Sequence, residues 1–173
     1  GHAAALFEMG VRYAAGNGVH RDDREAADWY RKAAERGHAL AQFNFAVRCG
    51  QGRGIDANDG LAAWWYRQAA DQNHPAAQFN LGTALGMAGR FDEAVAAFRK
   101  ALAERPGYGQ AHNNLGRLLF DSGQLDAAIR EYQLALQARP AAVAPRFNLA
   151  LALVSSGRTS EGMLHFDQAL KAT

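Results

Sequence analysis

Apolar residues recur along the chain at spacings of three and four residues, which is the period of a helix with one buried face. Residues 76–88 keep this spacing up to Gly89, and residues 92–104 resume it until Pro106. In the second stretch the apolar positions on one face are Ala94, Val95, Phe98, Ala101 and Leu102. Because proline cannot continue a helix and glycine readily adopts turn conformations, the pattern predicts two helices joined by a short turn.

The same pair of helices recurs along the whole chain. Its most regular segment reads AQFNFA at 41–46, AQFNLG at 77–82, AHNNLG at 111–116 and PRFNLA at 145–150, with a weaker first copy, ALFEMG, at 5–10. The copies follow one another at steps of 36 or 34 residues. A single helical hairpin of this length cannot bury its apolar face alone, whereas stacked hairpins can. The sequence therefore predicts an α-solenoid of five helix-turn-helix repeats.

Composition supports an all-α fold. Alanine fills 38 positions, whereas the β-branched residues Val, Ile and Thr together fill 11, and helices favour the first while strands favour the others. No apolar run approaches the roughly 18 residues that a membrane-spanning helix needs, so we expect no membrane span. The formal net charge is only +2, which gives little attraction for a polyanion.

The last three repeats resemble tetratricopeptide repeats. The signature positions are Leu81, Gly82, Leu85, Gly89, Ala94, Phe98, Ala101 and Pro106 in the third repeat, and Leu115, Gly116, Leu119, Gly123, Ala128, Tyr132, Ala135 and Pro140 in the fourth. The fifth repeat departs from the pattern, with Ala150 for the first small glycine and Gly162 for the small alanine. The small residues are expected where helices approach closely, because a larger side chain would overpack the contact.

The first two repeats resemble the related Sel-one-like repeat. The first contains GNGV at 16–19 and WYRKAA at 29–34, and the second contains GRGI at 52–55 and WYRQAA at 65–70. Together the resemblances cover the whole chain. They imply one repeat domain, residues 1–173, that forms a right-handed α-solenoid (an α–α superhelix). Its repeats are 3–38 and 39–74, Sel-one-like, and 75–108, 109–142 and 143–173, tetratricopeptide-like.

Residues with catalytic or metal-binding chemistry are scattered along the sequence. His38 and His74 lie 36 residues apart, so they occupy one repeat position and are not a chelating pair. The adjacent Asp22 and Asp23 lie near a helix start, where capping explains them better than acid–base chemistry. The single cysteine, Cys49, has no zinc-ligand spacing to a histidine. We therefore expect no enzymatic activity, no catalytic residues, no metal and no cofactor.

Aromatic residues on the second helices could be imagined as a platform for sugars or bases. Trp29 and Trp65 fall at positions that repeats of this kind fill with packing side chains, so we expect both in the core. The sequence does not decide the place of Trp64.

Four asparagines form the strongest candidate for a binding site. Asn44, Asn80, Asn114 and Asn148 occupy the same position on successive first helices. The resemblance implies that first helices line a concave groove, where the amides would stack as a ladder, as in the tetratricopeptide arms of O-linked N-acetylglucosamine transferases and kinesin light chains. A side-chain amide can pair with a passing backbone N–H and C=O, which suits an extended peptide. In the alternative, these asparagines are solvated or link helices.

Neighbouring positions complete the expected peptide-binding groove. The residues assigned to it beside the ladder are Phe79, Thr83, Asn113, Arg117 and Phe120. Only Asn114 and Arg117 could serve in a carboxylate clamp of the kind that captures chaperone C-termini, so that subclass is disfavoured. With one arginine and one aspartate, Asp121, among the groove positions, RNA binding is disfavoured as well.

The expected function is a non-catalytic scaffold for protein–protein interaction, which binds an extended peptide or partner segment in its concave groove. The alternative is the substrate-recruiting arm of a larger enzyme, such as a glycosyltransferase, whose catalytic domain would lie beyond Thr173. The chain enters a helical pattern at once, without a secretory signal, which slightly favours the cytoplasm. A periplasmic location stays open, because Gly1-His2 is also what cloning would leave after removal of an upstream signal.

The final predicted helix, residues 159–172, raises the question of what covers it. It carries Met163, Leu164, Phe166 and Leu170. One neighbouring helix can cover only part of a helix surface. We therefore expect some of these side chains to be exposed. Either more repeats follow in the natural protein or a second molecule covers this end, and we expect the chain to self-associate through a terminal hairpin at high concentration.

Overall fold

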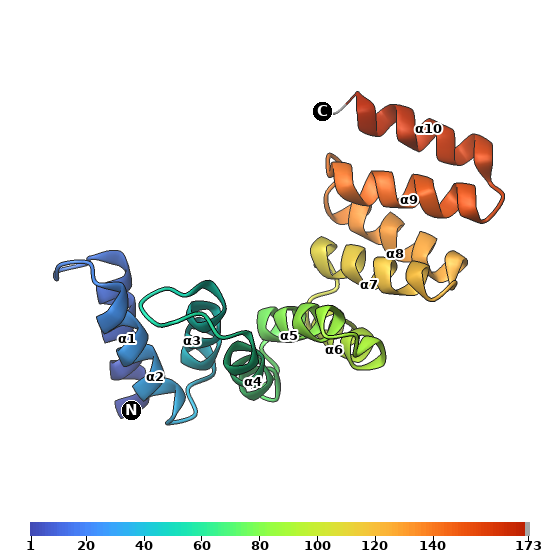
Figure 1. Ribbon diagram of the computed structural model, residues 1–173. Coiled ribbons are helices and arrows are strands. Elements are labelled where there is room, and N and C mark those ends of the chain that lie inside the picture. The colour runs from blue at the N-terminus through green and yellow to red at the C-terminus, as the bar shows by residue number, and fades with distance from the viewer. Residues whose placement is uncertain (172–173) are drawn as a thin grey trace. The chain divides into compact units, whose positions relative to one another are not determined.

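The computed structural model describes residues 1–171, and these form ten α-helices and no strand (Figure 1). The helices are α1 (His2–Ala15), α2 (Asp23–Ala34), α3 (Ala39–Gln51), α4 (Asp59–Ala70), α5 (Pro75–Met87), α6 (Phe91–Glu104), α7 (Gly109–Asp121), α8 (Leu125–Ala138), α9 (Val143–Ser155) and α10 (Thr159–Leu170). The all-α fold class predicted from the sequence is confirmed. The expected end of the last helix, Ala172, lies outside the described residues.

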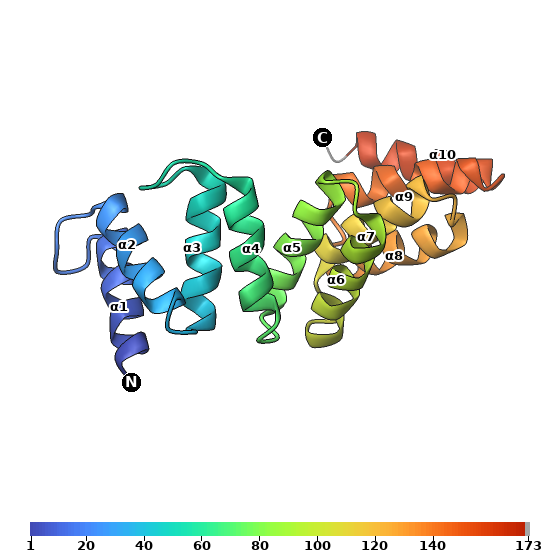
Figure 2. The ribbon, with the colours of Figure 1, turned by 60° about the horizontal axis from the view of Figure 1, so that its bottom comes forward.

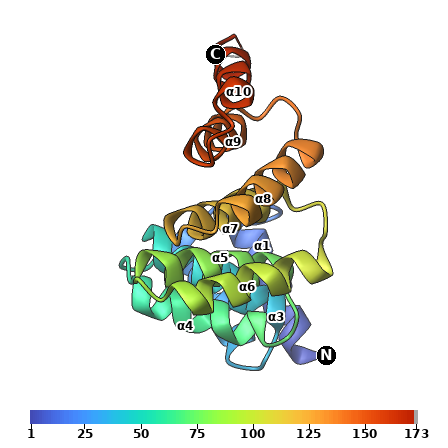
Figure 3. The same ribbon diagram turned by 90° about the vertical axis from the view of Figure 1, so that its right-hand side faces the viewer.

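The chain divides into two compact units, Gly1–Leu85 and the part from Gly86 onward. In the first unit α1 packs against α2, α2 against α3 and α3 against α4, and Figure 2 shows these helices side by side. In the second unit each helix from α6 to α10 packs against the next, and Figure 3 shows α9 beside α10. The pairs α1–α2, α3–α4, α7–α8 and α9–α10 therefore form hairpins of the kind that the repeat pattern predicts.

The core of the first unit is built from alanines with a few large aromatic side chains. Tyr30, Phe45 and Trp65 are buried in it, and Phe45 and Trp65 meet edge to face with their ring centroids 5.6 Å apart. Trp29 is half-buried and packs against the same cluster, so both tryptophans assigned to packing contact the core. Trp64, which the sequence left undecided, is 51% exposed.

Two histidines act as helix caps in this unit. The Nδ1 atom of His38 accepts a hydrogen bond from the backbone N–H three residues later at 3.2 Å, at the start of α3, and His74 makes the same contact in α5. The two imidazole rings stack on Phe7 and Phe43, with ring centroids 4.7 Å apart in both pairs. Their 36-residue spacing therefore marks a repeated cap that joins neighbouring repeats.

Close helix contacts in the second unit depend on small residues, as the sequence predicts. Ala94, Ala101, Ala128 and Ala135 are buried. A Cβ atom at Gly116 would lie 2.8 Å from Cε1 of Tyr132, which is too close for carbon atoms. The aromatic ring of α8 thus rests directly on the backbone of α7, and only glycine leaves room for it.

Replacing Gly116 by alanine should lower the free energy of unfolding by about 1 to 3 kcal/mol, because the Tyr132 ring must move. Gly50→Ala is the matched control, since its Cβ would meet Ala62 at an ordinary 3.6 Å. That change should raise stability by about 0.5 to 1 kcal/mol through lower backbone entropy of the unfolded chain. Urea denaturation followed by circular dichroism measures both, and equal effects at the two glycines would contradict the packing argument.

Candidate functional site

In the first unit, the predicted asparagine ladder comprises Asn44 on α3 and Asn80 on α5, both half-buried. The Asn44 amide hydrogen-bonds the hydroxyl group of Tyr30, and the Asn80 amide that of Tyr66. Burial raises the pKa of each phenol, and the amide contact lowers it against that larger effect. Each tyrosine belongs to the second helix of the preceding repeat, so these two amides link neighbouring repeats.

In the second unit, the amides contact one another. Nδ2 of Asn148 on α9 donates to Oδ1 of Asn113 on α7 at 3.0 Å, and Nδ2 of Asn113 lies 3.4 Å from Oδ1 of Asn114. Three of the predicted site residues thus form one chain of hydrogen bonds across two first helices. In both units the asparagines therefore link helices, which is the alternative role that the sequence left open for them.

The contacts leave the ladder amides with hydrogen-bonding capacity. A side-chain amide has two N–H donors and an oxygen with two lone pairs. The side chain of Asn44 uses part of this capacity on the Tyr30 hydroxyl. Asn44, Asn80, Asn114 and Asn148 are all half-buried, so part of each side chain still reaches the surface. The same amides can therefore join two helices and bond a further group.

The remaining predicted site residues differ in exposure and in how far their polar groups are already hydrogen-bonded. Arg117 is exposed and pairs loosely with Asp121, with Nη1 and Oδ2 3.8 Å apart. It shares one face of α7 with Asn113 and the half-buried Phe120, at spacings of four and three residues. On α5, the Thr83 hydroxyl donates to the carbonyl oxygen of Phe79 at 3.1 Å, so its proton is used within its own helix.

A second row of polar side chains, which the sequence reasoning missed, lies two positions before the ladder. Nε2 of Gln42 donates to the carbonyl oxygen of Ala34 at 3.2 Å, and Nε2 of Gln78 to that of Ala70 at 2.7 Å. Both glutamines are buried. In each case the acceptor is the last residue of the preceding second helix, where carbonyl groups lack helical partners.

The second unit keeps this bond with different side chains. Nε2 of His112 donates to the carbonyl oxygen of Pro106 at 2.8 Å, while its Nδ1 lies 2.6 Å from Oε2 of Glu131. In the last repeat Nη2 of Arg146 donates to the carbonyl oxygen of Pro140. The four donors are separated by the repeat steps of 36 or 34 residues. This regular spacing could have revealed the row from the sequence. It was missed because Gln, His and Arg differ too much in residue type to be recognised as one repeated position.

Among the described residues no three His, Cys, Asp or Glu side chains converge as metal ligands would. None of the helices described here combines the length and the apolar character needed to cross a membrane.

Comparison with known proteins confirms the resemblance seen in the sequence. The tetratricopeptide repeat pattern matches residues 59–109, 80–143 and 113–173, and the Sel1 repeat pattern matches residues 3–38 and 39–74. No curated protein matches the chain.

Several solved structures have a similar fold. A Sel1 repeat protein from Oxalobacter formigenes is 28% identical, with 99% of this chain and 74% of that chain covered and a TM-score of 0.78. A protective antigen of uropathogenic Escherichia coli with an SLR fold is 24% identical over 95% of this chain and 38% of its own, with a TM-score of 0.79. MamA from Desulfovibrio magneticus RS-1 is 16% identical over 98% of this chain and 94% of its own, with a TM-score of 0.77. The last two likenesses concern the fold alone.

The row of buried donors should be structural. Gln78→Met keeps the volume but removes the donor to the Ala70 carbonyl, so it should lower the free energy of unfolding by about 0.5 to 1.5 kcal/mol. The exposed Gln133 on α8 provides the control, since Gln133→Met should change stability by less than about 0.5 kcal/mol. Chemical denaturation of both variants tests this, and an unchanged midpoint for Gln78→Met would refute the role given to the row.

Proposed function

Because the chain belongs to the tetratricopeptide-repeat family, with two Sel1 repeats at residues 3–38 and 39–74, we propose that it is a non-catalytic scaffold for protein–protein interaction. Its first helices bind an extended segment of a partner protein. The observation that carries the proposal is a pair of half-buried ladder amides on first helices within each unit, Asn44 and Asn80 in the first and Asn114 and Asn148 in the second. Each is held in place by a hydrogen bond and keeps capacity for another.

The chemistry of the row suits a peptide backbone. An extended chain presents N–H and C=O groups at every residue, and one side-chain amide can pair with both. The amides are held by Tyr30, Tyr66 and one another. Prior ordering of this kind lowers the entropy lost on binding. In this arrangement the amides supply affinity that does not depend on the partner's side chains. In the second unit, Arg117 and Phe120 share a face of α7 with Asn113 and supply the selection.

Replacing Asn44 and Asn80 together by alanine should weaken binding of unrelated peptides alike, because backbone bonds worth about 0.5 to 1.5 kcal/mol each are lost. The probes are three unrelated peptides, selected from a random 12-residue library on the native chain and titrated by calorimetry. Tyr66→Phe is the matched comparison: it leaves the Asn80 amide but removes the hydroxyl group that orders it, so it should weaken binding of all three peptides by less than the double variant does. A loss confined to one peptide would instead indicate side-chain recognition.

The same surface would serve a substrate-recruiting arm of a larger enzyme. Pairing between side-chain amides and a peptide backbone is independent of any domain joined to the repeats. The two roles differ in whether the natural reading frame also encodes a catalytic domain, which sequencing of the full gene decides.

A second proposal concerns the surface of α10, which exposes large apolar side chains as expected from the sequence. Met163 is 53% exposed, Leu164 58% and Leu170 73%. Phe166 is half-buried, and its ring meets that of Phe147 at 5.0 Å. Since exposed apolar side chains gathered on one helix favour association, we propose that a second copy of the chain covers this face.

Sedimentation velocity from micromolar to near-millimolar protein tests the self-association. The native chain should show a rising sedimentation coefficient, and the double variant Met163→Lys, Leu164→Lys should remain a monomer. Met87→Lys is the control, because Met87 is 83% exposed on a different helix and should not matter. A strictly monomeric native chain would refute the proposal.

A further inference from the structure

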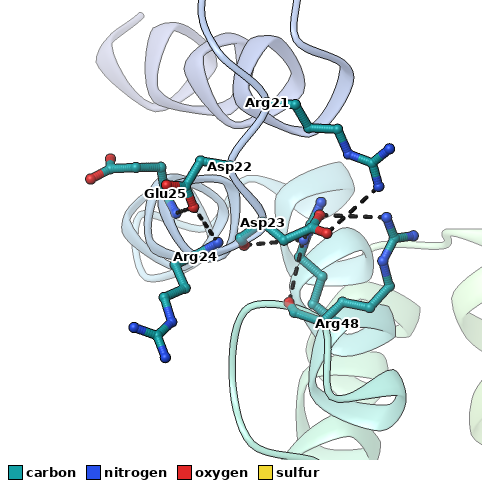
Figure 4. Close-up of polar contacts among 7 residues, drawn as sticks. Arg21, Asp22, Asp23, Arg24, Glu25 and Arg48 are labelled. Atoms are coloured by element: carbon teal, nitrogen blue, oxygen red, sulfur yellow. Dashed lines mark hydrogen bonds and ion pairs between the residues drawn. The ribbon is translucent and has the colours of Figure 1, made fainter.

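A buried arginine joins three segments of the first unit. The side chain of Arg48, on α3, is 7% exposed, and its Nη1 lies 2.9 Å from Oδ1 of Asp23 at the start of α2. The same nitrogen donates to the carbonyl oxygens of Asp23 at 3.2 Å and of Arg53 at 3.3 Å (Figure 4). Its guanidinium also lies over the ring of Tyr30, 5.4 Å from the centroid. Arg48 is therefore buried and held in place, through Nη1, as a structural residue.

The loop after α3 approaches α2 closely enough to bring in a second arginine. A Cβ atom at Gly54 would lie 1.9 Å from the carbonyl oxygen of Asp23, and the φ of Gly54 is +76°. Only glycine allows this approach. As a result, Nη2 of Arg53 in the same loop lies 3.4 Å from the Asp23 carboxylate.

Positively charged side chains outnumber negatively charged ones in the immediate contacts of Asp23. Asp23 is approached by Arg48, by Arg53 and by Arg21, whose Nη2 lies 3.6 Å from Oδ2. The hydrogen bond from Arg48 holds the pKa of Asp23 below its usual value. The carboxylate of the neighbouring Asp22 caps α2 instead, where it accepts the backbone N–H groups of the first turn (Figure 4). Three guanidinium groups thus share one carboxylate.

A pocket of about 140 Å³ opens beside these arginines. It is lined by Tyr30, Asn44, Val47, Arg48, Gln51 and Arg53. Arg53 is 45% exposed, and among the described residues its side chain bonds only to Asp23, through one nitrogen. A guanidinium has five N–H donors, so most of those of Arg53 are unused. The pocket therefore combines unused cationic donors with two side-chain amides and the apolar wall of Val47.

We propose that this pocket binds a carboxylate of the partner segment. The inference rests on the proposed function, because Asn44 of the ladder lines the pocket and would hold the backbone beside it. A carboxylate presents two coplanar oxygens, which match the fork of a guanidinium, and Val47 suits the methylene groups that precede an acidic side chain. At about 140 Å³ the pocket is smaller than the 300 to 1,000 Å³ typical of whole small-molecule ligands. It fits the end of one side chain or a chain terminus.

Arg48 and Arg53 differ in burial, so they are not equally suitable for a test by substitution. Arg48 is buried against Asp23, so its removal would leave a carboxylate without its main partner and destabilise the unit. Arg53 is exposed and weakly held at 3.4 Å. Recognition of the carboxylate is therefore assigned to Arg53, with Asn44 and Gln51 as neutral donors.

The test uses the full chain and a random 12-residue peptide library displayed with a free C-terminus. Selected peptides should carry an acidic group on which binding depends. Changing that group, by Glu→Gln or Asp→Asn in the peptide or by amidation of its C-terminus, should weaken binding to the native chain about tenfold or more. The side-chain changes and the amidation distinguish the two sources of the carboxylate. Selected peptides whose affinity is indifferent to all of these changes would overturn the proposal.

Chain variants assign the effect to Arg53. In Arg53→Gln the acidic and neutralised peptides should bind equally, whereas in Arg36→Gln, an exposed arginine at the far end of α2, the tenfold difference should persist. Gln51→Glu places a negative charge in the pocket and should weaken the acidic peptide selectively. Thermal denaturation followed by circular dichroism shows whether Arg53→Gln is folded. If it is not, Gln51→Glu still tests whether the acidic peptide depends on the pocket. A difference that survives in folded Arg53→Gln and in Gln51→Glu would overturn the assignment.

The result also separates this inference from the proposed function. Asn80 belongs to the ladder but does not line the pocket, so Asn80→Ala tests the ladder alone. If Asn80→Ala weakens all peptides but Arg53→Gln leaves the acid preference intact, the backbone-binding surface stands and the carboxylate pocket does not. If the acid preference depends on Arg53 while Asn80→Ala has no effect, the pocket stands and the ladder proposal fails.

Discussion

At or just beyond the end of four second helices, a carbonyl group accepts a hydrogen bond from a side chain of the first helix that follows. The donor is Gln42, Gln78, His112 or Arg146, always from the same position of that helix. The bond joins one repeat to the next near the end of a helix, where the regular backbone ladder stops. Stacking of apolar faces supplies most of the favourable free energy, but this bond sets where one pair lies on the other.

The asparagine row follows from that register. Once two repeats are aligned by the buried donor, the amide two positions later meets the tyrosine of the preceding repeat, as Asn44 meets Tyr30 and Asn80 meets Tyr66. The amide is thereby ordered but not used up, because it has more donors and lone pairs than one hydroxyl can occupy. Linking helices and binding a partner are thus compatible roles for one side chain.

The charge around Asp23 differs from what the net charge of the chain suggests. The net charge of +2 suggests a nearly neutral surface, yet Arg21, Arg48 and Arg53 surround the single carboxylate of Asp23. The excess arises because Gly54 lets the loop after α3 reach the start of α2. The carboxylate pocket that we propose depends on this local excess, because the exposed Arg53 keeps donors that Asp23 does not use.

The sequence by itself determined the architecture. Apolar spacing, repeat steps and the positions of glycine and proline predicted residues 76–88 and 92–104 as helices, and the structure has them at Pro75–Met87 and Phe91–Glu104. These features are local, since helix formation and termination depend on residues within a turn or two. The tertiary structure decided which polar groups meet. Arg48 and Asp23 are 25 residues apart, and Gln78, His112 and Arg146 share a role without sharing a residue type. Such contacts depend on how loops and side chains pack between repeats, and periodicity along the chain does not contain that information.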